Sequence, residues 1–169
     1  MGDVFLEQLV KRKPTGRDTL IRTGLILGVA IIFLVTMTII PGLGMIITLA
    51  FGFGAYILNG RLKKEYEYSF TNGELDIDVI YNRSSRKRIF NGHVRDFELM
   101  AHVDDQNHKN SLNTASERLD YSTGIPSGRS YNFLTNYKGK RVAIIIEPNE
   151  EMLAAIGKAM TRSKFYPKK

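Results

Sequence analysis

The sequence predicts an α+β membrane protein, in which a two-helix transmembrane hairpin precedes an antiparallel β domain that ends in a C-terminal helix. Three observations predict this fold class. Residues 23–58 contain no charged side chain and no histidine. From Glu65 onward, apolar and polar residues alternate with a period of two, as in half-buried strands. Near the C-terminus the apolar spacing changes to that of a helix.

Length and composition limit the possible functions. A chain of 169 residues has room for one soluble domain and a short anchor. It contains no cysteine, which excludes disulfides, thiolate catalysis and cysteine-based metal sites. The net charge of +7 is compatible with nucleic acid binding, but an anionic membrane surface explains the basic residues beside the apolar segments more simply. We therefore expect a lipid bilayer as partner, and no nucleic acid.

Two apolar segments make up the predicted hairpin, residues 23–60. Residues 23–40 would form a helix about 27 Å long, close to the hydrocarbon thickness of roughly 30 Å. Pro41, Gly42 and Gly44 then interrupt the helix, and a second apolar segment follows at residues 45–58. Because this second segment is short, a re-entrant hairpin remains an alternative. A cleaved signal peptide is not expected, since a second span follows the first.

Basic residues flank both segments, whereas the turn between them carries no charge. They are Lys11, Arg12, Lys13, Arg17, Arg22, Arg61, Lys63 and Lys64. The positive-inside rule predicts a multi-pass cell-membrane protein with two spans and both termini in the cytoplasm. Residues 1–22 would form a cytoplasmic juxtamembrane segment. Within it, Phe5, Leu6, Leu9 and Val10 recur at helical spacing, which predicts an amphipathic helix in the membrane interface.

Small residues recur four positions apart on both predicted spans. Gly24 and Gly28 form one such pair, and Ala50 and Gly54 form the other. This spacing allows two helix backbones to approach closely in a membrane. We expect the pairs to pack the hairpin on itself, with contact between chains of a homo-oligomer as the alternative.

Residues 61–169 are predicted to form the cytoplasmic β domain. Asn72-Gly73 favours a type I′ turn between strands near residues 65–70 and 75–79. A turn at residues 82–85 and a further hairpin at Asn91-Gly92 would complete a meander of four strands. Residues 104–116 are polar and predict a long loop. Strands at 118–121, 130–137 and 141–147 follow, with Lys138-Gly139 as a turn. A helix at about 149–162, capped by Asn149, would end the domain.

A strongly bent sheet of six or seven strands, closed at one end by a helix, is the architecture of a pleckstrin-homology (PH) barrel. Three stretches support this fold, EYEYSFTNGELDID from Glu65, NRSSRKR from Asn82 and IEPNEEML from Ile146. They resemble the bacterial PH-like domains that follow a pair of transmembrane helices in small membrane proteins of Gram-positive bacteria. The resemblance implies a PH-like antiparallel β-barrel with a C-terminal helix, and it brings no catalytic signature.

Four cations within six positions are the strongest candidate for a binding site. They are Arg83, Arg86, Lys87 and Arg88. Placed near a bilayer, each basic residue adds about 1 kcal/mol of attraction to anionic lipid. The cluster would bind anionic lipid headgroups or an anionic protein partner. The alternative is a solvated turn that only follows the positive-inside bias.

The other polar clusters favour no chemistry. His102, Asp104, Asp105 and His108 could suggest a metal site, but we interpret them as an ordinary polar loop. Asp76 and Asp78 alternate with apolar residues, as on a solvent-facing strand. We predict no catalytic residue, no metal and no cofactor. The sequence thus predicts a non-enzymatic interaction module for lipid headgroups or a protein partner. The alternative is a structural or regulatory subunit of a larger membrane complex, such as a transporter or secretion assembly.

Overall fold

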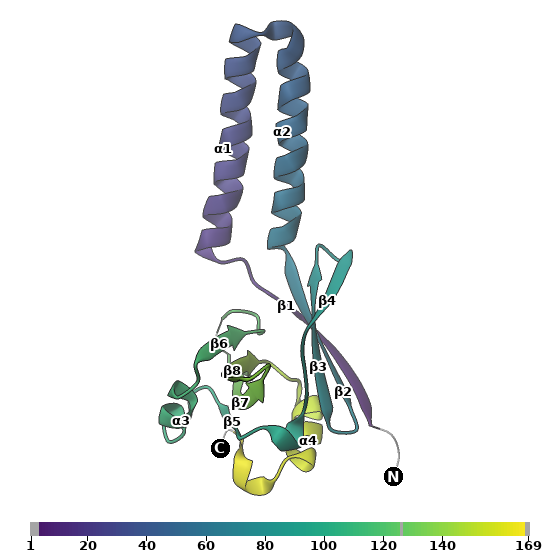
Figure 1. Cartoon of the computed structure of the whole chain (residues 1–169), viewed down its shortest axis with the longest axis vertical. Coiled ribbons are helices and arrows are strands. Elements are labelled where there is room, and N and C mark those ends of the chain that lie inside the picture. Colours follow the sequence, from purple (N-terminus) through teal and green to yellow (C-terminus); the bar gives the residue numbers. More distant parts are fainter. Residues whose placement is uncertain (1–3, 126, 168–169) are drawn as a thin grey trace. The chain divides into compact units, whose positions relative to one another are not determined.

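A computed structural model describes residues 4–125 and 127–167, and its chain divides into two compact units (Figure 1). The first unit comprises residues 14–64 and 81–85 and holds two long helices. The second comprises the remaining described residues and holds nearly all of the strands. Each unit has its own internal packing.

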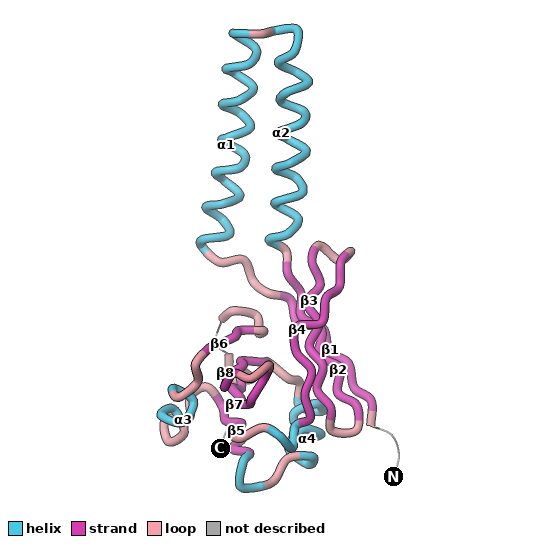
Figure 2. Tube along the Cα trace, in the orientation of Figure 1, coloured by secondary structure: helices cyan, strands magenta, loops and turns pink. Residues whose placement is uncertain are grey.

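The first unit is a helical hairpin of α1 (Gly16–Ile39) and α2 (Pro41–Leu62), drawn in cyan in Figure 2. Both helices are long and apolar enough to cross a membrane. The first begins seven residues before the apolar segment, because Thr15 and Asp18 form a capping box. Near the turn, Gly44 lies against the backbone of Thr36, where a Cβ atom would come within 2.9 Å of the Thr36 carbonyl. Glycine is therefore needed at this crossing.

The first sheet has four strands in the order β1-β2-β3-β4, namely β1 (Phe5–Lys11), β2 (Lys64–Thr71), β3 (Glu74–Tyr81) and β4 (Ser85–His93). The predicted turn between β2 and β3 is confirmed, with φ values of 51° at Asn72 and 98° at Gly73. Asn82 and Arg83 also have positive φ, at 47° and 57°, in the turn between β3 and β4.

The predicted amphipathic helix at the N-terminus is wrong, because this segment is strand β1. It pairs antiparallel with β2, from Phe5 opposite Thr71 to Lys11 opposite Glu65. Apolar residues at positions 5, 6, 9 and 10 suit a helix locally, but pairing with a distant strand satisfies the backbone and buries Val10. The β domain therefore includes the N-terminal strand and does not begin at residue 61, as predicted. The helical hairpin is an insertion between two neighbouring strands of one sheet.

The second sheet has five strands in the order β6-β8-β7-β5-β9. They are β5 (Leu99–His102), β6 (Glu117–Asp120), β7 (Tyr131–Tyr137), β8 (Lys140–Ile146) and β9 (Phe165–Tyr166). Lys138 and Gly139 form the predicted turn, with φ values of 51° and 76°. The predicted closed antiparallel barrel is wrong for the described residues, since their strands form two separate sheets and the pairs β6–β8 and β5–β9 are parallel.

Two further local predictions fail. No hairpin forms at Asn91-Gly92, because β4 continues to His93 and the short 3₁₀ helix η1 (Val94–Asp96) follows. Gly92 instead lies over the ring of Phe90, where a Cβ atom would come within 2.9 Å of Phe90 Cζ. The predicted polar loop contains the short helix α3 (Lys109–Asn113). Its Leu112 is buried against the second sheet, which explains why the segment is ordered.

Helix α4 (Glu150–Ala159) closes the core, as predicted. The Asn149 side chain accepts a hydrogen bond from Met152 N, and Met152 and Ile156 are fully buried. The rings of Phe97 and Phe133 stack within this core at a centroid distance of 4.2 Å. The 3₁₀ helix η2 (Arg162–Lys164) then leads into β9.

The side chain of Gln8 connects β1 to the start of α4. Its Nε2 donates to the Glu147 carbonyl at 2.8 Å, and its Oε1 accepts from Asn149 N at 2.6 Å. These two bonds bracket Pro148, which has no N–H of its own to donate. The N-terminal strand is thus an integral part of the second unit.

Candidate interaction site

The predicted basic cluster lies on β4 and the turn before it, but two of its cations are engaged in ion pairs. Arg86 Nε donates to Asp78 Oδ2 at 2.7 Å, and Arg88 Nε donates to Asp78 Oδ1 at 2.9 Å. Arg83 lies in the turn, and Lys87 is exposed and forms no ion pair with any described residue. The structure therefore leaves far less free positive charge here than the sequence suggests.

Asp78 is the centre of this network, and its side chain is only 6% exposed. Burial alone would raise the pKa of its carboxyl group, but the hydrogen bonds from Arg88 and Arg86 outweigh burial and lower the pKa. The carboxylate is charged at neutral pH and has a guanidinium on each oxygen. It is a buried anchor for both arginines, contrary to the solvent-facing position expected from the sequence.

Further carboxylates extend the network across the sheet. Arg86 also pairs with Glu67 on β2 at 3.0 Å, and Arg88 pairs with Asp76 on β3 at 2.7 Å. Asn91 donates to Asp76 as well. Three carboxylates thus face two guanidinium groups. This charge network, Glu67, Asp76, Asp78, Arg86 and Arg88, ties three strands together and carries no excess positive charge.

We expect Asp78→Asn to destabilise the protein by about 2 kcal/mol at pH 7, because two charge-assisted hydrogen bonds are lost. The pKa of Asp78 is lower in the folded state than its ordinary value of 3.8. Its stabilisation is therefore present above that value and disappears as the pH falls through the folded pKa. Urea unfolding of the detergent-solubilised chain, followed by circular dichroism, should show the difference in stability between the two proteins shrinking as the pH falls below 3.8.

Glu74→Gln is the matched control, since Glu74 is an exposed carboxylate on the same strand. It should change the free energy of unfolding by less than about 0.5 kcal/mol. Equal effects of the two substitutions would contradict a central role for Asp78.

Comparison with known proteins identifies the family of the chain. A family model described as Bacterial PH-like domain (DUF6106) matches residues 2–166. The chain belongs to this bacterial PH-like family. The match covers β1, the helical hairpin and both sheets. No curated protein and no solved structure matches the chain. The family establishes a PH-like domain here, in the form of two sheets and a C-terminal helix.

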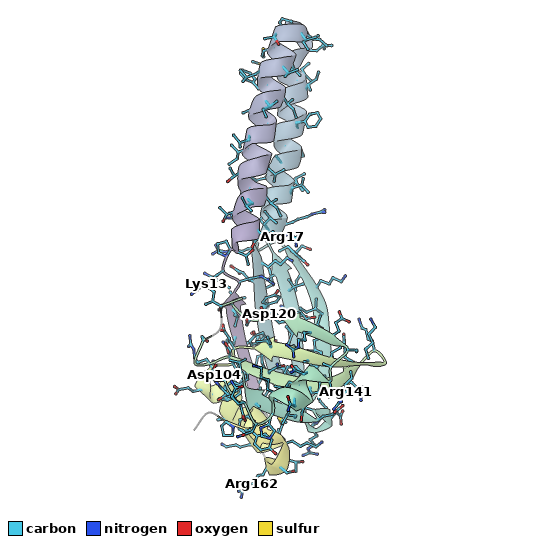
Figure 3. The ribbon with its side chains drawn as sticks, turned by 90° about the vertical axis from the view of Figure 1, so that its left-hand side faces the viewer. Lys13, Arg17, Asp104, Asp120, Arg141 and Arg162 are labelled. Atoms are coloured by element: carbon cyan, nitrogen blue, oxygen red, sulfur yellow. The ribbon has the colours of Figure 1, made fainter. Side chains whose placement is uncertain are left out.

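The histidine and aspartate cluster of this PH-like domain lines a pocket of about 600 Å³, together with Phe165 and Tyr166. Three of the four ring nitrogens of its two histidines have partners. His102 Nδ1 is 3.2 Å from Asp104 N, and its Nε2 is 3.1 Å from the Gly128 carbonyl. His108 pairs with Asp105 at 2.8 Å. Among the described residues no three such side chains could hold one metal ion. The side chain of Asp104, labelled in Figure 3, is 74% exposed.

The PH-like domain also contains a buried carboxylate that the sequence does not predict. Glu147 Oε1 accepts hydrogen bonds from Ser127 Oγ and Ser130 Oγ, both at 2.9 Å, and Oε2 accepts from Thr123 N at 3.2 Å. These bonds fix the connection between β6 and β7. No local signal marks this network, because its donors lie about twenty residues before Glu147 in the sequence.

The four small residues of the hairpin line one apolar groove of about 380 Å³ between α1 and α2. They are Gly24, Gly28, Ala50 and Gly54. A Cβ atom added at any of the three glycines would meet nothing within 4 Å. The close approach of the two helices occurs elsewhere, at Gly44. Contact of the groove with another helix stays a prediction.

Proposed function

We propose that this chain is an integral membrane protein whose PH-like domain is a non-enzymatic module that binds a protein partner. Two helices of membrane-spanning length support the anchor. The pairing of β1 with β2 argues against a single crossing, because strands that join the two ends of the hairpin must lie on one side of the bilayer. By the positive-inside rule, that side is the cytoplasm of the cell membrane.

The charge network favours a protein partner over lipid headgroups. Attraction to an anionic bilayer needs basic residues that are not paired with carboxylates, whereas Arg86 and Arg88 are both paired with Asp78. On the same face of the sheet, Phe5 is 60% exposed and Leu9 is 49% exposed. Leu9 lies opposite Glu67, so these apolar side chains border the network. Exposed apolar residues beside charges of both signs are typical of protein interfaces.

In-cell photo-crosslinking tests this function on the full chain. A photoreactive amino acid at Leu9 should give a discrete protein adduct. The same amino acid at Lys138, on the exposed turn between β7 and β8, should give none. No adduct at either position, or equal adducts at both, would overturn the proposal.

Hydrogen exchange of the full chain in lipid nanodiscs tests the lipid alternative. We expect equal protection of residues 81–93 in zwitterionic and in anionic bilayers. Salt-sensitive protection in anionic bilayers that Lys87→Ala removes would instead assign the surface to lipid headgroups. Lys87 is the informative position, because replacing Arg86 or Arg88 would also break the charge network.

A second candidate function is a subunit of a larger membrane complex, and the groove between the helices favours it. Open space beside Gly24, Gly28 and Gly54 can admit a helix from another protein. Gly28→Ile fills this space, so it should release a stoichiometric partner that co-purifies with the native chain. Retention of that partner would exclude the groove as its contact.

A further inference from the structure

The outer edge of β1 has unpaired backbone groups. Asn72 N donates to the Val4 carbonyl at 3.1 Å, so Val4 and Asn72 form a hydrogen-bonded pair. In an antiparallel ladder such pairs alternate, which directs the N–H and C=O groups of Leu6, Gln8 and Val10 toward β2. The same groups of Phe5, Glu7 and Leu9 point away from the sheet. They have no partner within the described part of the chain.

This edge has only part of the usual protection against strand addition, since its one lysine, Lys11, is the last residue of the strand. Strand β1 has seven residues and contains no proline. Lys13 N donates to the Thr123 carbonyl at 2.8 Å, so the neighbouring chain approaches only beyond the end of the strand. The exposed side chains of Phe5 and Leu9 flank the charge of Glu7. The stretch from Phe5 to Leu9 therefore offers both backbone groups and apolar surface.

An apolar groove lies on the other face of the same edge. It has a volume of about 410 Å³ and lies between β1, β2 and helix α4. Leu6 and Phe70 line it from the strands, and Ala154 and Ala155 line it from the helix. Because side chains alternate across a strand, every second residue of an added strand would point toward this groove. The small alanines leave room for a bulky apolar side chain.

We propose that the β1 edge binds an extended segment of a partner protein by strand addition, with an apolar side chain in the groove beside α4. This inference rests on the proposed function and identifies the surface through which the partner protein binds. The partner segment carries apolar residues next to Phe5 and Leu9, and a lysine or arginine next to Glu7. Main-chain hydrogen bonds supply affinity, and the groove supplies selectivity.

Selection from a displayed library of random twelve-residue peptides against the full chain in nanodiscs tests the proposal. Enriched peptides should alternate apolar residues with a basic residue between them. Glu7→Pro removes an N–H that the sheet does not use, so the fold tolerates it and peptide binding should weaken at least tenfold. Ala155→Leu fills the groove and should have a similar effect. Glu7→Ala keeps the N–H and is the matched control, with a loss of threefold or less.

Three outcomes would overturn strand addition. They are selection of peptides without the alternating pattern, unchanged binding to both Glu7→Pro and Ala155→Leu, and self-association of the chain that Glu7→Pro abolishes. The last outcome would make a second copy the occupant of the edge. The crosslinked adduct at Leu9 distinguishes failure of strand addition from failure of the proposed function. An adduct that persists in Glu7→Pro would leave a protein partner in place, bound in another way.

Discussion

A chain truncated to begin at Arg61 will not fold, although it contains the whole predicted β domain. It lacks β1, and with it the ladder from Phe5 to Lys11 and the two hydrogen bonds of Gln8. Loss of the buried Val10 costs about 1.5 to 3 kcal/mol, loss of the half-buried Leu6 costs about half as much, and each lost hydrogen bond costs about 1 kcal/mol. The sum approaches the whole stability of a typical domain, about 5 to 15 kcal/mol.

Rejoining the strands is the matched control. Lys11 lies opposite Glu65, so a short glycine-rich linker can replace residues 14–63 and connect residues 4–13 directly to Lys64. This shortened chain should be soluble and should unfold cooperatively in urea. The truncated chain should show neither property by circular dichroism and size-exclusion chromatography. Cooperative unfolding of the truncated chain with similar stability would show that β1 is dispensable.

Gly44→Val should destabilise the helical hairpin by about 3 kcal/mol, because the new Cβ would collide with the backbone of Thr36 rather than with a movable side chain. The collision would also disturb the hydrogen bond from Thr36 Oγ1 to the Gly44 carbonyl. Separation of the helices can be followed during unfolding in sodium dodecyl sulfate by energy transfer between dyes on cysteines introduced at Leu20 and Leu58. The native chain has no cysteine that would interfere.

Gly54→Val on the same helix is the control, since its Cβ would meet nothing within 4 Å. It should leave the unfolding midpoint nearly unchanged. Equal shifts for the two variants would mean that the helices are not held together at Gly44.

Elements with local signals were predictable from the sequence. The turns at Asn72-Gly73 and Lys138-Gly139 need positive φ, and Asn149 caps the helix that follows it. Strand β1 was not predictable, because its partner lies beyond two long helices and its apolar spacing also suits a helix. Asn91-Gly92 was misleading, since the glycine there accommodates the ring of Phe90 rather than a turn.

The ion pairs of the candidate site could not be predicted from the sequence, because they also join segments that are distant along the chain. Four cations close together on one strand and its turn are visible in the sequence. The carboxylates that neutralise two of them belong to β2 and β3, and only the folded sheet brings them into contact. The exposed edge of β1 and the groove beside it could not be predicted from the sequence either, because both depend on recognising the N-terminal segment as a strand.

The insertion of the hairpin between β1 and β2 has a consequence for biosynthesis. The ribosome makes β1 first, but its pairing partner emerges only after both helices have been made. At about 5 to 20 residues per second, β1 waits several seconds with its apolar residues uncovered. If the two helices span the bilayer as we propose, failure of one of them to insert would leave β1 and β2 on opposite sides, where they could not pair. On the proposed function, folding of the domain would therefore report correct insertion, and a misinserted chain would present an incomplete sheet to quality-control proteases.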